Sequence, residues 1–369
     1  MAAMIKGQTV EIGGKSAYHK WIESQGIPIL REFYIEDLRK VELVPWAWKD
    51  ARGAYLNLIG TGDVNDGYLL EMAPGKSIAP QRLLFEEIIF VLEGSGSTSV
   101  WNDESKKVTF EWQAGSLFSP PANTWRQHFN ASGQKPARLL AVTTAPVLFN
   151  LFRDTDFILN NSYQFKGRFD EDPESFSGTG ESYRGRRMQV WDTNFVADVR
   201  TLPVHRWEDR GPGAASVSIE LSENSLTSHI SEFPVGTYKK AHRHGPGAHV
   251  IIIGGQGYSL MWPEGEPIKR FDWKDGSVVV PPERWFHQHF NTGAAPARYL
   301  AIRWGSQKYP RPWQMKSYGV DESVKTGGSQ IEFEDEDPEI RRMFEAELAK
   351  QGLQSRMTYT KAARRPDFV

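Results

Sequence analysis

Apolar positions along the chain fall in short runs rich in Val, Ile, Phe and Tyr, and most of these runs end at glycine, proline or asparagine. Residues 88–94 and 250–257 each contain one run followed by a glycine turn, whereas residues 112–121 and 273–282 contain a turn followed by a run. Short apolar runs bounded by turn residues predict strands joined by hairpins. The pattern therefore predicts an all-β protein made of barrels or double-sheet sandwiches.

The strand pattern occurs twice. Residues 75–130 match residues 236–291 at a constant separation of 161, and residues 135–142 match residues 295–302 with a slip of one residue. Internal repeats of this kind decide the architecture before any local pattern does. The identical positions include Gly115/Gly276, Pro121/Pro282, Gln127/Gln288, His128/His289 and Asn130/Asn291. Two tandem β domains are expected.

The repeat sets the expected domain boundaries. We predict an N-terminal domain over residues 1–150, a polar, Gly- and Ser-rich linker over 151–200, a C-terminal domain over 201–310 and an extension over 311–369. Residues 15–28 show helical spacing, and a second helix is expected to begin at Asp337 and Pro338 and to stop at Gly352. These peripheral helices are expected to brace the barrels or a contact between subunits.

Composition narrows the function classes. The chain has 44 basic and 46 acidic residues, so no net field favours nucleic acid or an acidic membrane, and the expected partner is a small molecule or a second copy of the chain. Cysteine is absent, which leaves histidines and carboxylates as metal ligands. The N-terminus lacks a signal-peptide pattern and no window is apolar enough for a membrane helix, so a cytoplasmic location is expected. Strand edges and the extra arms favour a homodimer or a higher homo-oligomer.

Histidines are concentrated in the second copy. His242 and His244 are two residues apart on one expected strand, and His287 and His289 repeat this spacing on another. Residues two apart in a strand face the same side, so their imidazoles are expected to converge inside the barrel. We predict a transition-metal site with His242, His244 and His287 as ligands.

These motifs resemble those of the cupin superfamily, over residues 75–142 and 236–302. The matching positions are Gly236, His242, His244 and Gly255 in the first motif and Gly276, Pro282, His287 and Asn291 in the second. The resemblance implies a bicupin, with tandem double-stranded β-helix (jelly-roll) barrels and peripheral helices. The family's glutamate position holds Ala248 here. The neighbouring His249 is expected to face outward, although a loop adjustment that swings it inward stays open.

A ligand set of three neutral imidazoles leaves the full divalent charge on the metal and favours an anionic, chelating substrate. Residues 241–255 and 285–291 look similar to the metal motifs of gentisate and salicylate dioxygenases, apart from one extra residue between Trp285 and His287. In several of those bicupins the N-terminal domain holds the iron, and here the placement is reversed.

That resemblance implies an Fe(II) dioxygenase that uses dioxygen to cleave a C–C bond of a small aromatic hydroxy acid. Mn(II), Ni(II) and Zn(II) also suit imidazole ligands. Two alternatives stay open: an oxygen-independent metal cupin acting as a lyase, isomerase or decarboxylase, and a non-catalytic bicupin that binds a small molecule.

The first copy has lost the three histidines. Gln81, Leu83 and Arg126 occupy the equivalent positions, and Glu87 stands at the family's carboxylate position. Leucine cannot bind a metal, and arginine brings a permanent positive charge. We therefore expect no metal in this domain and an ion pair between Glu87 and Arg126 inside the barrel.

Six further residues are considered for substrate binding. A guanidinium at Arg303 offers a bidentate partner for a carboxylate, but a surface arginine is an equal alternative. The aromatic residues either line a pocket or fill the core. Gln288 and His289 recur in the first copy as Gln127 and His128, which favours a structural role for them. The six are His289, Arg303, Gln288, Tyr258, Trp262 and Trp285.

Overall fold

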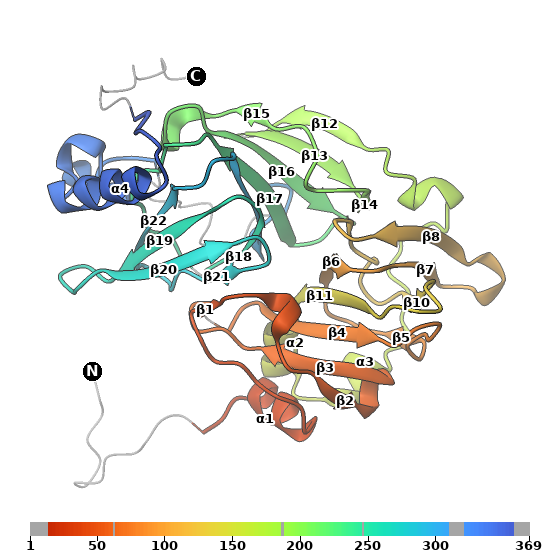
Figure 1. Cartoon of the computed structure of the whole chain (residues 1–369). Helices are drawn as coiled ribbons and strands as arrows, with labels where there is room; N and C mark the ends of the chain where they lie inside the picture. Colours follow the sequence, from red (N-terminus) through yellow and green to blue (C-terminus); the bar gives the residue numbers. More distant parts are fainter. Residues whose placement is uncertain (1–13, 62, 186–187, 246, 310–320, 358–369) are drawn as a thin grey trace, which may run out of the picture.

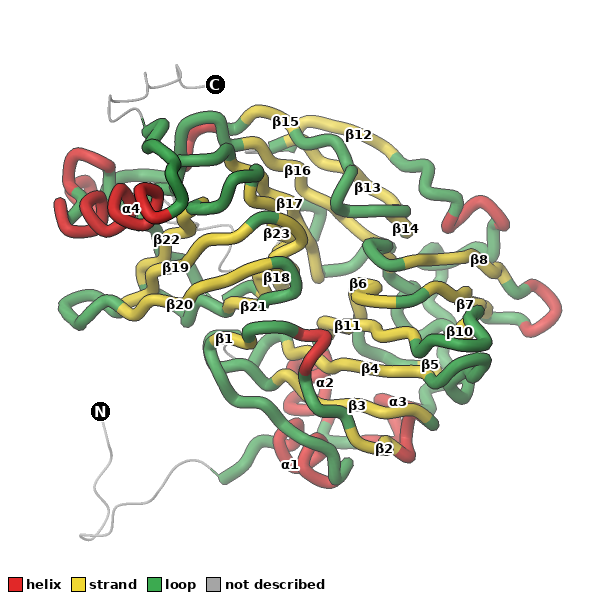
Figure 2. The backbone as a smooth tube through the Cα atoms, in the orientation of Figure 1, coloured by secondary structure: helices red, strands yellow, loops and turns green. Residues whose placement is uncertain are grey.

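A computed structural model of the chain describes residues 14–61, 63–185, 188–245, 247–309 and 321–357. Strands dominate these residues and form two double-sheet units, one mainly from the first half of the chain and one mainly from the second (Figure 1). Figure 2 shows the few helices at the periphery of the strands. The predicted fold class, tandem cupin-type β-sandwiches with peripheral helices, is confirmed. Within the described residues, no helix has the length and apolar character needed to span a bilayer.

The first sandwich contains the following strands: β2 (Val44–Trp46), β3 (Ala51–Leu56), β4 (Asp66–Met72), β5 (Gln81–Arg82), β6 (Glu87–Glu93), β7 (Ser95–Trp101), β8 (Val108–Gln113), β9 (Leu117–Phe118), β10 (Trp125–Asn130), β11 (Ala137–Thr143) and β14 (Phe195–Val196). A seven-stranded sheet in the order β14-β9-β6-β11-β4-β3-β2 packs against a four-stranded sheet in the order β5-β10-β7-β8. Side chains of both sheets, such as Phe110 of β8 and Leu139 of β11, share one buried core.

The second sandwich contains β1 (Tyr34–Ile35), β12 (Glu181–Arg184), β13 (Gln189–Thr193), β15 (His205–Arg206), β16 (Ala215–Leu221), β17 (Leu226–Phe233), β18 (His249–Gly254), β19 (Gln256–Trp262), β20 (Lys269–Lys274), β21 (Val278–Val279), β22 (Phe286–Asn291) and β23 (Ala297–Trp304). Its large sheet has the order β1-β21-β18-β23-β17-β16-β13-β12, with β15 paired to β16, and its small sheet has the order β20-β19-β22. Val250 of the large sheet and Met261 and Trp273 of the small sheet belong to one core.

The two large sheets also pack against each other. Leu69 and Leu140 of the first sandwich lie in the same buried cluster as Ile230 and Leu300 of the second. A strand covered on both faces needs apolar residues at every position, not at every other one. This explains the unbroken apolar runs in the sequence, since all seven residues of β11 are buried.

Short strands are exchanged between the two halves. Tyr34 of β1 pairs with Val279 in the second sandwich, and Phe195 of β14 pairs with Phe118 in the first. The segment expected as a linker, residues 151–200, differs from that expectation because β12 and β13 extend the large sheet of the second sandwich. Only part of the expected C-terminal extension is described, since residues 310–320 and 358–369 lie outside the described ranges.

The repeat in the sequence corresponds to a repeat in the fold. Strands β6 to β11 recur as β18 to β23 in the same order, and β7/β10 pair as β19/β22 do. Gly96 and Gly257 occupy equivalent positions where a Cβ atom would clash with the carbonyl oxygen of Phe129 or Phe290 on the neighbouring strand. Glycine is therefore required at both positions by the close backbone approach.

Helices form the predicted arms. They are α1 (Ala17–Ser24), α2 (Ala145–Phe152), α3 (Thr155–Leu159) and α4 (Pro338–Lys350), with 3-10 turns at Leu38–Lys40, Ala47–Lys49, Glu104–Lys106, Pro173–Phe176, Glu208–Arg210, Val324–Thr326 and Phe333–Asp335. The two helices expected from the sequence, α1 and α4, are confirmed. Asp337 caps α4 by accepting from the backbone N–H of Glu339 at 2.9 Å, and Gly352 follows with φ of +67°. Phe344 and Leu348 of α4 are fully buried in one cluster with Tyr258 and Phe290 of the small sheet. Figure 1 shows α4 beside this sheet.

A buried carboxyl ties α1 to the first sandwich. The Tyr18 hydroxyl donates to Asp66 at 2.6 Å, and the Asn57 amide donates to the same oxygen at 3.2 Å. Burial raises the pKa of Asp66 to about 8, against the lowering effect of the Tyr18 hydrogen bond. The folded chain therefore keeps a proton on Asp66 at pH values where the unfolded chain has lost it.

This proton makes stability depend on pH. A pKa raised by folding contributes stability that is fully present below the unfolded value of about 4 and is lost as pH rises through about 8. We expect the free energy of unfolding of wild type to fall, relative to Asp66→Asn, by about 1.4 kcal/mol per pH unit within this window. Urea unfolding of both proteins from pH 4 to pH 8 measures the difference. A difference that does not change with pH contradicts a protonated Asp66.

Candidate metal centre

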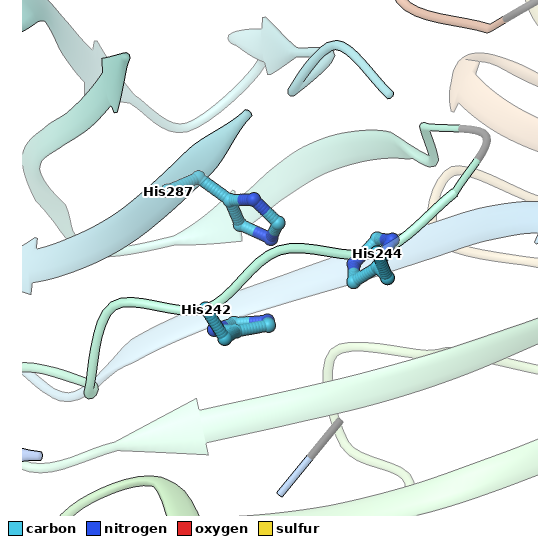
Figure 3. A group of neighbouring side chains, drawn as sticks. All are labelled: His242, His244 and His287. Atoms are coloured by element: carbon cyan, nitrogen blue, oxygen red, sulfur yellow. The ribbon is translucent and has the colours of Figure 1, made fainter. Parts of the chain in front are cut away.

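Three histidine side chains converge inside the second sandwich (Figure 3). The nitrogen atoms available as ligands in His242, His244 and His287 all lie within 4.8 Å of one another. The ring centroids are 4.3 Å apart for His242 and His287, 4.9 Å for His244 and His287 and 5.6 Å for His242 and His244. An ion bound to nitrogen at about 2.1 Å spans ligand pairs up to about 4.2 Å apart. The limit of 4.8 Å exceeds this span by about 0.6 Å, so the three rings need to close by no more than that amount to hold one ion.

Two different backbone elements position these rings. His287 lies on β22, whereas His242 and His244 lie in the extended segment that precedes β18 (Figure 3). The expectation that His242 and His244 lie in a strand is wrong. His242 forms an isolated bridge with His287, with N–H···O distances of 3.1 and 2.9 Å, while the next residue donates its N–H to Ser329. The segment is held between β22 and the C-terminal segment and so forms no regular ladder.

Hydrogen bonds orient all three imidazoles. The Nδ1 atoms of His242, His244 and His287 lie 3.1, 3.3 and 3.2 Å from backbone carbonyl oxygens. A carbonyl only accepts, so each Nδ1 carries the hydrogen and each Nε2 keeps its lone pair. Burial lowers the pKa of His287 to about 4 and holds the pKa values of His242 and His244 well below the ordinary value. The rings are therefore neutral and ready to bind a cation through Nε2.

The surroundings of the three rings are positively charged. After burial, the charge that most lowers the pKa of His242 is that of Arg210, and Arg303 and Lys239 act on His244 and His287. Asp321 partly offsets Arg210 through an ion pair of 2.9 Å. Neutral ligands together with nearby cations make this interior attractive to an anion.

His289 belongs to a chain of hydrogen bonds that has an equivalent in the first sandwich. The Trp273 indole donates to the Ser259 hydroxyl at 3.0 Å, and that hydroxyl lies 2.7 Å from Nδ1 of His289. In the first sandwich the corresponding Trp112, Thr98 and His128 are linked by distances of 2.9 and 2.8 Å. Because the chain persists where the metal ligands are lost, it favours the structural role for His289.

Arg303 faces the interior of the second sandwich. It lies on β23 opposite Thr227, and its charge lowers the pKa values of His244 and His229. This placement agrees with the expectation from alternation. Its function as a partner for a substrate carboxylate stays a prediction.

Three residues considered for substrate binding lie on the opposite face of the small sheet. Gln288 donates to the carboxylate of Glu336 at 2.6 Å and to a backbone carbonyl at 3.1 Å. Tyr258 stacks on Phe290 with ring centroids 4.5 Å apart, and Trp262 belongs to the same cluster, which α4 covers. These side chains therefore pack the C-terminal segment onto the sheet and do not line the site.

Trp285 and His249 lie at contacts with the N-terminal part of the chain. The Trp285 ring packs on Phe33 with a centroid distance of 5.5 Å. His249 is fully buried, and its Nδ1 lies 3.2 Å from the Asn65 amide of the first sandwich. The outward direction expected for His249 is therefore what the structure has, and this side chain lies outside the three-histidine cluster.

Charged side chains fill the equivalent space of the first sandwich. The predicted ion pair is confirmed, with Arg126 Nη2 donating to Glu87 at 2.8 Å and both side chains buried. Tyr68 donates to the other Glu87 oxygen at 2.5 Å, and Lys49 donates to Tyr68 at 3.1 Å and to Gln81 at 2.6 Å. Burial alone would raise the pKa of Glu87, but Arg126 and Lys49 hold it below its usual value.

Sequence reasoning missed three residues of the second interior, His229, Lys239 and Arg210. Lys239 is 2% exposed, and its ammonium group donates to the Tyr299 hydroxyl at 2.9 Å and also to Ser231. Burial lowers the pKa of His229 to about 3. His229 lies among serines and a threonine along β17, so no alternation distinguishes it, and Lys239 and Arg210 belong to no motif.

No family model matches the chain, and no curated protein matches it. Solved structures of oxalate decarboxylases are similar at the level of the whole chain. The Lactobacillus farciminis enzyme in complex with formate is 14% identical, covers 80% of this chain and 96% of its own, and gives a TM-score of 0.49. The Bacillus subtilis enzyme at pH 4.6 is 13% identical, with 82% and 85% covered and a TM-score of 0.48. A further structure of the latter enzyme, described by its Mn(II) centres, has 14% identity, coverage of 81% and 85% and a TM-score of 0.47.

At these identities and TM-scores, the activity, metal and substrate of the oxalate decarboxylases are not transferred to this chain. The tandem double-sheet architecture of this chain follows from its own sheet order and from the repeat of β6 to β11 in β18 to β23.

Proposed function

We propose that the second sandwich is a divalent-metal enzyme acting on a small carboxylate. The observation that carries the proposal is the convergence of three neutral imidazoles, each oriented through Nδ1, beside the positive charges of Arg210, Arg303 and Lys239. His242, His244 and His287 would hold the ion. A bound divalent ion would supply a Lewis-acid charge for an anionic substrate.

Arg303 supports the choice of a carboxylate as substrate. A planar guanidinium forms two parallel hydrogen bonds to a carboxylate, which fixes the orientation of the bound molecule. The positive charge of Arg303 lowers the pKa of His244, so both groups act on the same interior. We propose Arg303 as the residue that orients the substrate.

Lys239 and Tyr299 support an oxygen-independent reaction, a decarboxylation or related cleavage. Loss of carbon dioxide from a carboxylate leaves an electron pair on carbon, and a proton must be delivered there to form a C–H bond. The Lys239 ammonium, whose pKa burial lowers, is 2.9 Å from the Tyr299 hydroxyl and acts electrostatically on His287. We propose that this pair delivers the proton, because an ammonium with a lowered pKa gives up its proton more readily.

Substitution of Lys239 tests this assignment. In Lys239→Met, which keeps the length of the side chain and removes the proton, we expect turnover to fall about 100-fold or more while bound metal is unchanged. Lys240→Met is the matched control, because Lys240 pairs with Glu332 at 2.6 Å on the neighbouring segment. Steady-state rates and metal analysis of both variants give the comparison, and a fully active Lys239→Met removes the proton-donor role.

Oxygen dependence tests the reaction class. Metal-depleted protein is reloaded separately with Mn(II), Fe(II), Ni(II) or Zn(II) and incubated with small mono- and dicarboxylates and with hydroxybenzoates, with and without oxygen. We expect carbon dioxide release at equal rates in both atmospheres with at least one metal. Turnover that stops without oxygen and consumes it stoichiometrically contradicts the proposal.

That last outcome would favour the second possibility, an Fe(II) dioxygenase that cleaves an aromatic hydroxy acid. One observation favours it: Ala248, at the position of the family's glutamate, is buried in the core, so the ligand set stays at three histidines as in the gentisate and salicylate enzymes that the motifs resemble. The hydroxybenzoates are included in the substrate panel for this reason.

A further inference from the structure

A cavity lies where the first sandwich meets the second, and none of the three histidines lines it. Its volume is about 620 Å³. Side chains of α2, α3 and the segment that follows form most of the wall, and Ser225 and Trp304 of the second sandwich complete it. Small-molecule sites have volumes of about 300 to 1,000 Å³ and mostly apolar walls. The size and the lining of this cavity are those of a ligand site.

Exposed aromatic side chains are concentrated at this cavity. Among the described residues, eight large hydrophobic side chains are exposed, and four of them line it: Phe152, Phe157, Tyr163 and Phe165, at 43%, 43%, 60% and 37%. They form two ring pairs with centroid distances of 4.9 and 5.4 Å. A contiguous apolar patch of this kind marks a binding surface more often than chance exposure does.

The two charged groups that line the cavity, Glu86 and Arg168, lie next to each other. Glu86 accepts hydrogen bonds from the backbone and hydroxyl of Ser225 and from the Leu226 backbone at 2.7 to 3.0 Å. Arg168 lies 3.7 Å from Glu86 and donates to Asn224 at 3.0 Å. The wall therefore presents no net charge to an occupant, which favours a neutral molecule.

The position of the cavity in the repeat points the same way. Leu84 and Ala122 correspond, through the separation of 161 residues, to Gly245 and Glu283 beside the metal-binding histidines. In the second sandwich Gly245 directly follows His244 and lies next to Glu283. In the first sandwich the equivalent positions carry apolar side chains that line the cavity.

We propose that this cavity binds a small, neutral, apolar molecule, aromatic or branched aliphatic. The proposal is independent of the activity of the second sandwich, because the cavity shares no residue with the three-histidine cluster.

A neutral fluorescent probe, N-phenyl-1-naphthylamine, tests the site. We expect wild type to bind one equivalent with a blue-shifted emission. Val147→Trp fills the cavity from α2 and should weaken binding by about 10-fold or more. Leu151→Trp is the matched control, because Leu151 lies on the same helix, is 63% exposed and does not line the cavity. Its affinity should equal that of wild type.

A second variant protects the result from a folding artefact. Phe157→Ala removes one wall of the aromatic rim without filling the cavity and should also weaken binding, with far-ultraviolet circular dichroism and metal content unchanged. Equal affinity in Val147→Trp and wild type, or equal loss in Leu151→Trp, overturns the proposal. A wild-type protein that binds no probe also overturns it. If light scattering then shows a dimer of wild type that dissociates on Val147→Trp, a second copy of the chain covers the patch instead.

Discussion

His287→Ala is expected to abolish metal binding and activity together. The substitution removes one of three ligands, and loss of a residue that only supports a ligand already costs about 10- to 100-fold in metal affinity. We therefore expect affinity to fall by more than about 100-fold, with turnover falling in proportion to the bound metal. The measurements are elemental analysis of the purified protein, titration calorimetry with Mn(II) and Fe(II), and the rate assay.

Two features separate a ligand role from a folding role in this experiment. The bridge between His242 and His287 is made by backbone atoms, so alanine at position 287 keeps it. His249→Gln is the control, because His249 is equally buried but contacts Asn65 of the first sandwich. It should retain full metal content. A His287→Ala protein that keeps bound metal and turnover contradicts the three-histidine centre, and metal loss in His249→Gln assigns that residue to the site.

The metal cluster was predictable because the signals for it are local. A His-x-His pair and a third histidine in matching register require only that each segment be extended and that the two segments pair. The same holds for α4, whose cap at Asp337 is encoded within one turn. The convergence of the three histidines and the position of α4 were therefore predicted correctly, even though the His-x-His segment is an extended loop and not a strand.

The faces of the small sheet were not predictable from alternation. Both faces of β19 and β22 are buried, one by the interior of the sandwich and the other by the C-terminal segment. Alternation separates Tyr258 and Trp262 from Ser259, but it does not tell which set faces the interior. The answer depends on α4, which lies about eighty residues away in the sequence.

The domain boundaries were also only partly predictable from the sequence, because short strands pair with the other half of the molecule. β1 and β14 are two residues long, and each pairs with the other half of the molecule. A two-residue strand carries almost no periodicity, so its partner is fixed by the packed structure. Arg210 and Lys239 were not predicted for a related reason. Only the folded structure brings their charges near the histidines.

Glu87→Leu is expected to destabilise the first sandwich strongly. The substitution leaves Arg126 and Lys49 as buried cations without their common anion, and breaking a buried ion pair by removing one partner costs about 3–5 kcal/mol. Urea unfolding at pH 7 measures the loss of free energy. The exposed pair between Arg341 and Glu345, 2.8 Å apart, provides the control, since Glu345→Leu should cost less than about 1 kcal/mol.

The double substitution Glu87→Leu/Arg126→Met distinguishes pairing from packing. Removal of both charges leaves only Lys49, whose pKa of about 8 keeps most of it charged at pH 7 and whose ammonium retains its hydrogen bonds to Tyr68 and Gln81. We therefore expect the double variant to regain most of the stability lost in Glu87→Leu, as apolar replacement of buried ion pairs is often close to neutral. Equal losses in the single and double variants would instead mean that the shape of these side chains, and not their charge, supports the sandwich that carries no histidine ligands.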